Sequence, residues 1–206
     1  MAFSLSSDME RDFLPTTTYA VLGLLGFGQE LSGYEVRQWA LRSLRFFFWT
    51  PAQSHVYREL RRLEELGLAA SRDVPQEGRP DKRVFAITDE GRRELARWID
   101  EAPLAPPVLK YDSALRLFFG QHARPGRLEE IIDEHRAAVQ QTLDELDAVR
   151  AVLAAGGPPE DTSEETGRWA LADAVAVWGQ KLWRSDLAAL ARLRREVGAA
   201  RSRGAP

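Results

Sequence analysis

Cysteine is absent from this chain of 206 residues. Its absence excludes disulfide bonds, thiol nucleophiles and cysteine-ligated metal sites. Such a composition suits the reducing cytoplasm, where we expect the protein to reside.

Long apolar segments are absent as well. The longest apolar run spans residues 19–27, far short of the roughly 20 residues that cross a bilayer. The chain also shows no secretory signal. We therefore expect no membrane-spanning segment and no membrane partner.

Groups that carry catalysis or bind metals are sparse. The three histidines, at positions 55, 122 and 135, lack the spacing of metal ligands, and no Ser-His-acid constellation accompanies them. His135 falls on the apolar stripe of its helix, where a satisfied core or interface histidine is expected. The glycines of residues 23–28 do not follow the order of a dinucleotide-binding loop. The sequence thus predicts no enzyme, no catalytic residue, no metal and no cofactor.

Positive charge is outweighed overall, because the net charge is −3, but it is concentrated in one region. Residues 37–83 contain ten Lys or Arg and six Asp or Glu, a net charge of +4, and the remainder of the chain carries −7. Such a basic patch attracts nucleic-acid phosphates. We therefore expect a DNA-binding region in the first half of the chain.

Residues 50–67 (TPAQSHVYRELRRLEELG) predict a helix within this basic region. Thr50 offers a capping hydroxyl, Pro51 suits the first helical position, and Gly67 is the expected stop. One apolar stripe is formed by Val56, Leu60 and Leu63. The remaining face is polar and basic and carries Gln53, Ser54, Arg58, Arg61 and Arg62.

A hairpin with a basic tip follows this helix. Residues 68–74 alternate weakly, a turn follows, and residues 83–87 return as a second strand. The tip carries Arg79, Lys82 and Arg83. A helix with a basic outer face followed by such a wing is typical of a winged helix-turn-helix, in which the helix enters the major groove and the wing lies along phosphates. The expected partner is double-stranded DNA.

Three further helices are expected in the same region. A core helix begins at Thr16 with a threonine cap, and a second begins at the capping box of residues 32–35 and runs through Leu44. A third begins at Thr88 and runs to about residue 102. The fold class is therefore mainly α with a small β-hairpin wing.

A proline-rich segment at residues 103–109 divides the chain. Its prolines prevent a continuous helix. We therefore expect a winged helix-turn-helix domain at residues 1–102 and a helical dimerisation domain at residues 110–206.

The second domain is predicted to be helical throughout. A short helix precedes residue 120, a long one covers residues 128–153, and a last one opens at a capping box at residues 162–165. One short and two long amphipathic helices cannot bury all of their apolar faces against one another, so some apolar surface needs a further partner. A two-fold dimer of antiparallel helices covers them and sets two recognition helices roughly 34 Å apart, which suits a palindromic operator. An intrachain bundle packed on the first domain is the alternative.

With this layout, the chain resembles the PadR family of winged-helix transcriptional regulators, in the branch with a longer helical C-terminal domain. The matching stretches are YAVLGLLGFGQELSGYEVRQWA, SHVYRELRRLEELGL and GRPDKRVFAITDEGRRELARWI, and ALRLFFG matches more loosely. The resemblance implies a homodimeric repressor that, in several members, releases its operator when a small aromatic effector binds near the dimer interface. It also implies that Tyr57 is the tyrosine of the recognition helix. Two positions depart from the family pattern, because Phe85 replaces the usual wing tyrosine and His55 replaces a small or apolar residue.

The candidate DNA contacts lie on the helix and the wing. The first helical turn is expected to reach base edges, with Gln53 suited to adenine and Arg58 to guanine or a phosphate. Arg61 and Arg62 are expected to contact phosphates or to pair with neighbouring glutamates, and a solvated helix face is the alternative. The full set is Gln53, Ser54, His55, Tyr57, Arg58, Arg61, Arg62, Arg79, Lys82 and Arg83.

Aromatic residues supply the candidates for effector binding. Trp98 and Trp178 are expected to stack on a ring, with core packing as the alternative. The aromatic run at residues 46–49 either fills the corner between two helices or lines a small-molecule pocket.

Two other functions stay open. A winged-helix protein-interaction module without DNA binding has no need of the clustered arginines. An enzyme that uses the aromatic second half lacks paired acid and base groups.

Overall fold

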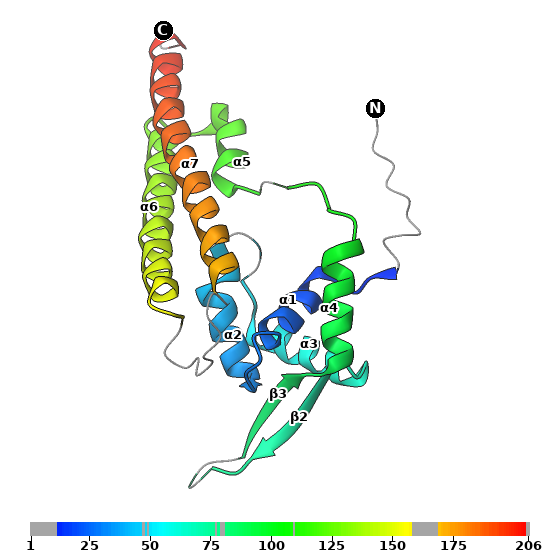
Figure 1. Ribbon diagram of the computed structural model, residues 1–206. Coiled ribbons are helices and arrows are strands. Elements are labelled where there is room, and N and C mark those ends of the chain that lie inside the picture. The colour runs from blue at the N-terminus through cyan, green and yellow to red at the C-terminus, as the bar shows by residue number, and fades with distance from the viewer. Residues whose placement is uncertain are drawn as a thin grey trace. The chain divides into compact units, whose positions relative to one another are not determined.

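The computed structural model describes residues 12–46, 48, 50–76, 78, 81–108, 110–157 and 169–204. The chain divides into two compact units, residues 1–106 and residues 107–206, and the division falls in the proline-rich segment. The first unit contains, in chain order, α1 (Thr16–Leu25), β1 (Leu31–Ser32), α2 (Gly33–Arg42), the 3-10 helix η2 (Leu44–Phe46), α3 (Gln53–Glu65), β2 (Ala69–Val74), β3 (Lys82–Ile87) and α4 (Asp89–Glu101) (Figure 1). The second contains α5 (Asp112–Phe118), the 3-10 helix η3 (Gly120–His122), α6 (Arg127–Ala154) and α7 (Ala170–Gly204). A mainly helical fold with a small β-sheet is confirmed.

α1 lies in the core of the first unit. Its side chains are apolar nearly all round, and Tyr19, Leu22 and Leu25 are at most 1% exposed. The threonine cap predicted at Thr16 is wrong, because Pro15 occupies the N-cap position and no side chain caps the helix. The carbonyl of Pro15 instead accepts the first helical hydrogen bonds, so Thr16 already lies inside the first turn.

The capping box predicted at the start of α2 is confirmed. The Ser32 hydroxyl accepts a bond from the Glu35 N–H at 3.3 Å, and the Glu35 carboxylate accepts one from the Ser32 N–H at 2.8 Å. The helix ends at Arg42, earlier than predicted, and Leu44 belongs to η2. Within the aromatic run at residues 46–49, Phe46 is buried, and residues 47 and 49 lie outside the described residues.

α3 begins three residues later than predicted. Its N-cap is Ala52, and no side chain caps it, so the roles assigned to Thr50 and Pro51 are wrong. Pro51 is buried, and its carbonyl accepts a bond from Arg37 Nε at 3.2 Å. This tie to α2 holds the segment before α3 extended, and the helical turns start only after it.

The predicted stop at Gly67 is confirmed. Gly67 has a φ of +71°, its N–H bonds to the Glu64 carbonyl, and the Leu68 N–H bonds back to the Leu63 carbonyl at 2.8 Å. This is a Schellman motif, which needs the left-handed conformation that glycine adopts without strain.

The predicted hairpin is present, with one strand that the sequence did not indicate. β2 and β3 pair antiparallel from Ala69 with Ile87 to Val74 with Lys82. The two residues of β1 pair with the other edge of β3, which gives the strand order β1-β3-β2. In Figure 1 the β2–β3 hairpin projects from the helices of its unit, as a wing does.

The junction between the wing and α4 is closely packed. The Thr88 hydroxyl caps α4 by accepting a bond from the Gly91 N–H at 3.0 Å, and it donates to the Gly67 carbonyl at 2.8 Å. The Thr88 N–H donates to the Leu68 carbonyl at 3.1 Å. Gly91 is buried against that same carbonyl. The predicted start of α4 is therefore confirmed.

The second unit is a pair of long antiparallel helices, α6 and α7, with the short α5 beside them (Figure 1). Ile132 and Val139 of α6 pack with Leu190 of α7. The predicted long helix at residues 128–153 is confirmed. The capping box at residues 162–165 lies outside the described residues.

None of the helices in the described part of the chain combines the length and the apolar character needed to cross a membrane.

Candidate nucleic-acid interface

α3 has one buried face and one exposed face. Val56, Leu60 and Leu63 are completely buried. The predicted contact residues occupy the other side, where Ser54, Tyr57, Arg58, Arg61 and Arg62 are exposed and Gln53 and His55 are half-buried. The apolar stripe thus fixes the rotation of the helix about its axis, and the polar set faces solvent as one surface.

Arg61 and Arg62 have no side-chain hydrogen bond or ion pair within the described part of the chain. The glutamate predicted as one of their partners, Glu64, is engaged elsewhere. It accepts bonds from Ser71 Oγ at 2.6 Å and from Arg83 Nη2 at 2.8 Å. The two arginines therefore present uncompensated charge to an approaching anion.

The Tyr57 ring lies against the first residue of α2. A Cβ atom placed on Gly33 would lie 2.5 Å from Tyr57 Cε1, so any larger residue there displaces the ring. Tyr57 remains 42% exposed. Its ring is thus supported from one side by α2 and open to solvent on the other.

Lys82, the residue of β3 nearest the turn of the wing, is paired within the unit. Its Nζ lies 2.8 Å from Glu35 Oε1, the same carboxylate that completes the capping box of α2. Burial raises the pKa of Glu35, but hydrogen bonds from Lys82 and Ser32 outweigh it, and the pKa lies below its ordinary value. A phosphate that binds Lys82 must therefore share it with an ionised carboxylate.

Arg83 is paired in the same way. It donates to both carboxylate oxygens of Glu64, at 2.8 and 2.9 Å, and to Ser71 Oγ. The hydrogen bond from Ser71 and those from Arg83 lower the pKa of Glu64. Arg79, the third basic residue predicted at the tip, lies outside the described residues.

Trp98, predicted to stack on an effector, already stacks on Tyr19, with ring centroids 4.7 Å apart and an interplanar angle of 9°. The Tyr19 hydroxyl donates to Glu94 at 2.5 Å. Burial, with this hydrogen bond, raises the pKa of Tyr19 to about 12. Trp98 thus lies over a neutral phenol at the edge of the core of its unit.

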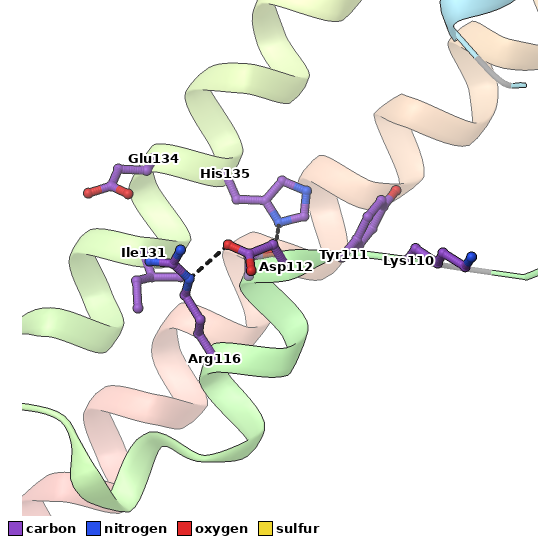
Figure 2. Close-up of a pocket in the computed structure, with 8 residues that line it drawn as sticks. Lys110, Tyr111, Asp112, Arg116, Ile131, Glu134 and His135 are labelled. Carbon is purple, nitrogen blue, oxygen red and sulfur yellow. Dashed lines mark hydrogen bonds and ion pairs between the residues drawn. The ribbon is translucent and has the colours of Figure 1, made fainter. Parts of the chain in front are cut away.

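A pocket of about 370 Å³ lies in the second unit beside α5 and α6 (Figure 2). Its lining residues are Lys110, Tyr111, Asp112, Ser113, Arg116, Ile131, Glu134 and His135. The charged groups are largely paired, Arg116 with Asp112 at 2.7 Å and Glu134 with Arg127 at 2.7 Å. None of the residues predicted to contact DNA or an effector lines it.

Ser113, His135 and Asp186 meet beside this pocket, although they come from three helices. Ser113 Oγ lies 2.8 Å from His135 Nδ1, and His135 Nε2 lies 3.6 Å from Asp186 Oδ2. The Tyr111 ring meets the imidazole edge-on. The prediction of a satisfied histidine is confirmed. A hydrolytic triad needs its carboxylate hydrogen-bonded to the ring to orient it, and the 3.6 Å separation exceeds that distance.

α7 carries a row of large apolar side chains that the second unit leaves exposed. Leu171 is 82% exposed, Val175 44%, Trp178 58% and Leu182 49%. The spacing of these residues puts them on one face of the helix. Trp178, the second predicted effector contact, is therefore a member of this exposed apolar stripe.

Sequence reasoning missed two residues that shape the α3 surface. Gly33 supports Tyr57 from another helix, and nothing in the local pattern indicates it. Glu59 is 4% exposed and lies four residues after His55, whose Nε2 it approaches at 3.3 Å. That spacing within one helix was the available signal.

Comparison with known proteins agrees with this geometry. Residues 21–97 match the profile of the "Transcriptional regulator PadR-like family". A Mycobacterium tuberculosis protein named "Probable transcriptional regulator Rv1176c" is 49% identical over 87 residues, which are 42% of this chain and 45% of that protein. The chain thus matches less than half the length of that relative.

The "Negative transcriptional regulator PadR" of Bacillus subtilis is 27% identical over 152 residues, 73% of this chain and 82% of that protein. Its crystal structure with operator DNA superposes with a TM-score of 0.71 at 23% identity, covering 89% of this chain and 98% of that one. The same protein has been solved with p-coumaric acid, and that structure superposes with a TM-score of 0.62. These relatives are named as regulators and not as enzymes. Residues 21–97 therefore form a PadR-like domain, and the resemblance of this chain to the PadR family of transcriptional regulators is confirmed.

Proposed function

We propose that this protein is a dimeric transcriptional repressor that binds a palindromic DNA operator through α3 and the wing. The observation that carries the proposal is the outward face of α3. It presents Tyr57, Arg58, Arg61 and Arg62 to solvent on a helix whose opposite face is completely buried. A helix held in this way presents one fixed surface to the major groove, and its arginines suit phosphates and guanine.

The charge distribution supports DNA as the partner. The net charge of +4 over residues 37–83 contrasts with −7 elsewhere. The acidic remainder disfavours non-specific adhesion of the rest of the chain to nucleic acid, because like charges repel. Binding is therefore expected to depend on this one surface.

The exposed apolar stripe of α7 supports the dimer. Four large apolar side chains in one row are costly to leave in water. A second copy that covers them brings two α3 helices together, and a two-fold arrangement of this kind matches a palindromic site.

A small aromatic effector completes the proposal. It is supported by the Bacillus subtilis relative solved with p-coumaric acid and by the exposed ring of Trp178. Adding p-coumaric acid is expected to quench tryptophan fluorescence and to lower operator affinity, and Trp98→Phe and Trp178→Phe variants identify the ring involved. Operator affinity that stays constant in saturating compound would remove the effector and leave the DNA-binding proposal intact.

The wing is tested by replacing Arg79 and Lys82 together with alanine. Affinity for all duplexes is expected to fall, and the slope of log K against log salt to decrease by about one for each lost phosphate contact. The measurement is an electrophoretic shift of the upstream DNA across salt concentrations.

Lys181→Ala in the second unit is the matched control for this experiment, because it removes a cation outside the proposed interface. An unchanged salt slope in the double variant would show that the wing does not contact DNA. A wild-type protein that binds no duplex at low salt would favour the alternative, a winged-helix protein-interaction module.

A further inference from the structure

Glu59 is an unusual residue for a helix that faces DNA. A carboxylate repels phosphates, and a buried one is costly unless it is hydrogen-bonded. Glu59 lies in the middle of α3 and is only 4% exposed. Its burial beneath the exposed face keeps the negative charge away from the surface and calls for partners.

One oxygen of this carboxylate is tied to the core. Thr18 Oγ1, on α1, donates to Glu59 Oε2 at 2.8 Å, and Thr18 is completely buried. The side chain of Glu59 is therefore held in one orientation by a helix that takes no part in the proposed DNA surface.

The other oxygen points toward that surface. Glu59 Oε1 lies 3.4 Å from Arg58 Nε and 3.3 Å from His55 Nε2. Arg58 Nε donates to this oxygen, and the Arg58 side chain is 65% exposed. The carboxylate thus links the buried core to two residues at the edge of the exposed face.

The bond to Arg58 uses the Nε atom of the guanidinium. Within the described part of the chain, Glu59 is the side-chain partner of Arg58, and the two Nη groups are unoccupied. A guanidinium that is restrained at Nε still presents a planar pair of N–H donors, the geometry that pairs with guanine or a phosphate. Restraint before binding reduces the side-chain entropy lost on binding.

We propose that Glu59 is a positioning residue of the DNA-binding surface, which holds the Arg58 guanidinium in the orientation that contacts DNA. This inference rests on the proposed function of α3. It assigns to the Thr18–Glu59–Arg58 chain a role in the affinity of Arg58 for its target, separate from its role in the stability of the unit.

A double-mutant cycle tests this role. Arg58→Ala is expected to lower operator affinity about tenfold. Glu59→Gln keeps the shape of the side chain and removes its charge, and it is expected to lower affinity about fivefold by releasing Arg58. If Glu59 acts through Arg58, the double variant binds as Arg58→Ala alone does. The proposal is overturned if the fold-losses in operator affinity of the two single variants multiply in the double variant. It is also overturned if Glu59→Gln alone leaves operator affinity unchanged.

A second variant covers the case in which Glu59→Gln does not fold. Thr18→Val replaces the hydroxyl behind the carboxylate with a methyl group of similar size. It is expected to weaken operator binding when introduced into the wild type but not when introduced into Arg58→Ala. The proposal is contradicted if Thr18→Val lowers operator affinity equally in the wild type and in Arg58→Ala, or if it changes the affinity of neither. Unfolding by denaturant, measured on each variant, separates a loss of folded protein from a loss of contact.

Glu65→Gln is the matched control, because it makes the same substitution at an exposed position of the same helix. Its operator affinity is expected to equal or slightly exceed that of the wild type. A failure of the proposed function itself has a different signature, because the wild type then binds no duplex and Arg58→Ala changes nothing.

Discussion

Replacing Trp178 and Leu182 with glutamate is expected to convert the proposed dimer to a monomer and to lower operator affinity by roughly 100-fold. These two side chains are 58% and 49% exposed and occupy successive turns of the exposed apolar stripe on α7. The change removes the apolar area that a second copy covers in the proposed dimer, and it would set like charges against each other across the two-fold axis of that dimer. A monomer binds only one half-site of the operator, so it loses the gain in affinity that comes from binding two linked half-sites at once.

Sedimentation equilibrium and an electrophoretic shift measure the two effects separately. Lys181→Glu is the matched control, since it changes the net charge by the same amount on the same helix but lies off the stripe. It is expected to remain a dimer with nearly unchanged affinity. A double variant that still sediments as a dimer contradicts the assignment of this face, and a monomer with undiminished affinity contradicts binding at two half-sites.

Gly91→Ala is expected to destabilise the first unit by about 3 kcal/mol. A Cβ atom at this position would lie 2.1 Å from the Leu68 carbonyl oxygen and 2.9 Å from Ile87 Cγ1. The Leu68 oxygen is backbone and accepts the Thr88 N–H at 3.1 Å, so it cannot move without disturbing the start of α4. Denaturant unfolding followed by circular dichroism measures the loss.

Gly23→Ala provides the comparison, because the same methyl group is added to a helix with no atom within 4 Å of it. It is expected to stabilise the protein by about 0.5–1 kcal/mol, since alanine loses less backbone entropy than glycine on forming a helix. Equal stabilities of the two variants would mean that the junction between the wing and α4 is looser than these distances imply.

The features that sequence predicted well depend on residues close together in the chain. The capping box of Ser32 and Glu35 and the Schellman motif at Gly67 each involve a few consecutive residues, and both are confirmed. The apolar stripe of α3 repeats at helical spacing, so the direction of its polar face followed without any tertiary information.

The features that sequence did not predict depend on distant partners. The α3 start was placed at Thr50 because a local cap was visible, but Arg37 holds the Pro51 carbonyl from another helix. Thr18 and Glu59 lie 41 residues apart, and no periodicity connects them. The residues expected to contact DNA were identified by type and helical face, whereas the carboxylates that pair Lys82 and Arg83 depend on the fold.

Polar bonds near both ends of the α6–α7 pair restrict how this unit can move. Arg150 Nε lies 2.8 Å from Asp173 Oδ1 near one end, and Arg194 Nε lies 2.8 Å from Asp133 Oδ1 near the other. Sliding one helix past the other by a single turn, about 5.4 Å, breaks both pairs at once. A ratchet motion of one helix along the other is therefore disfavoured, because it costs both ion pairs.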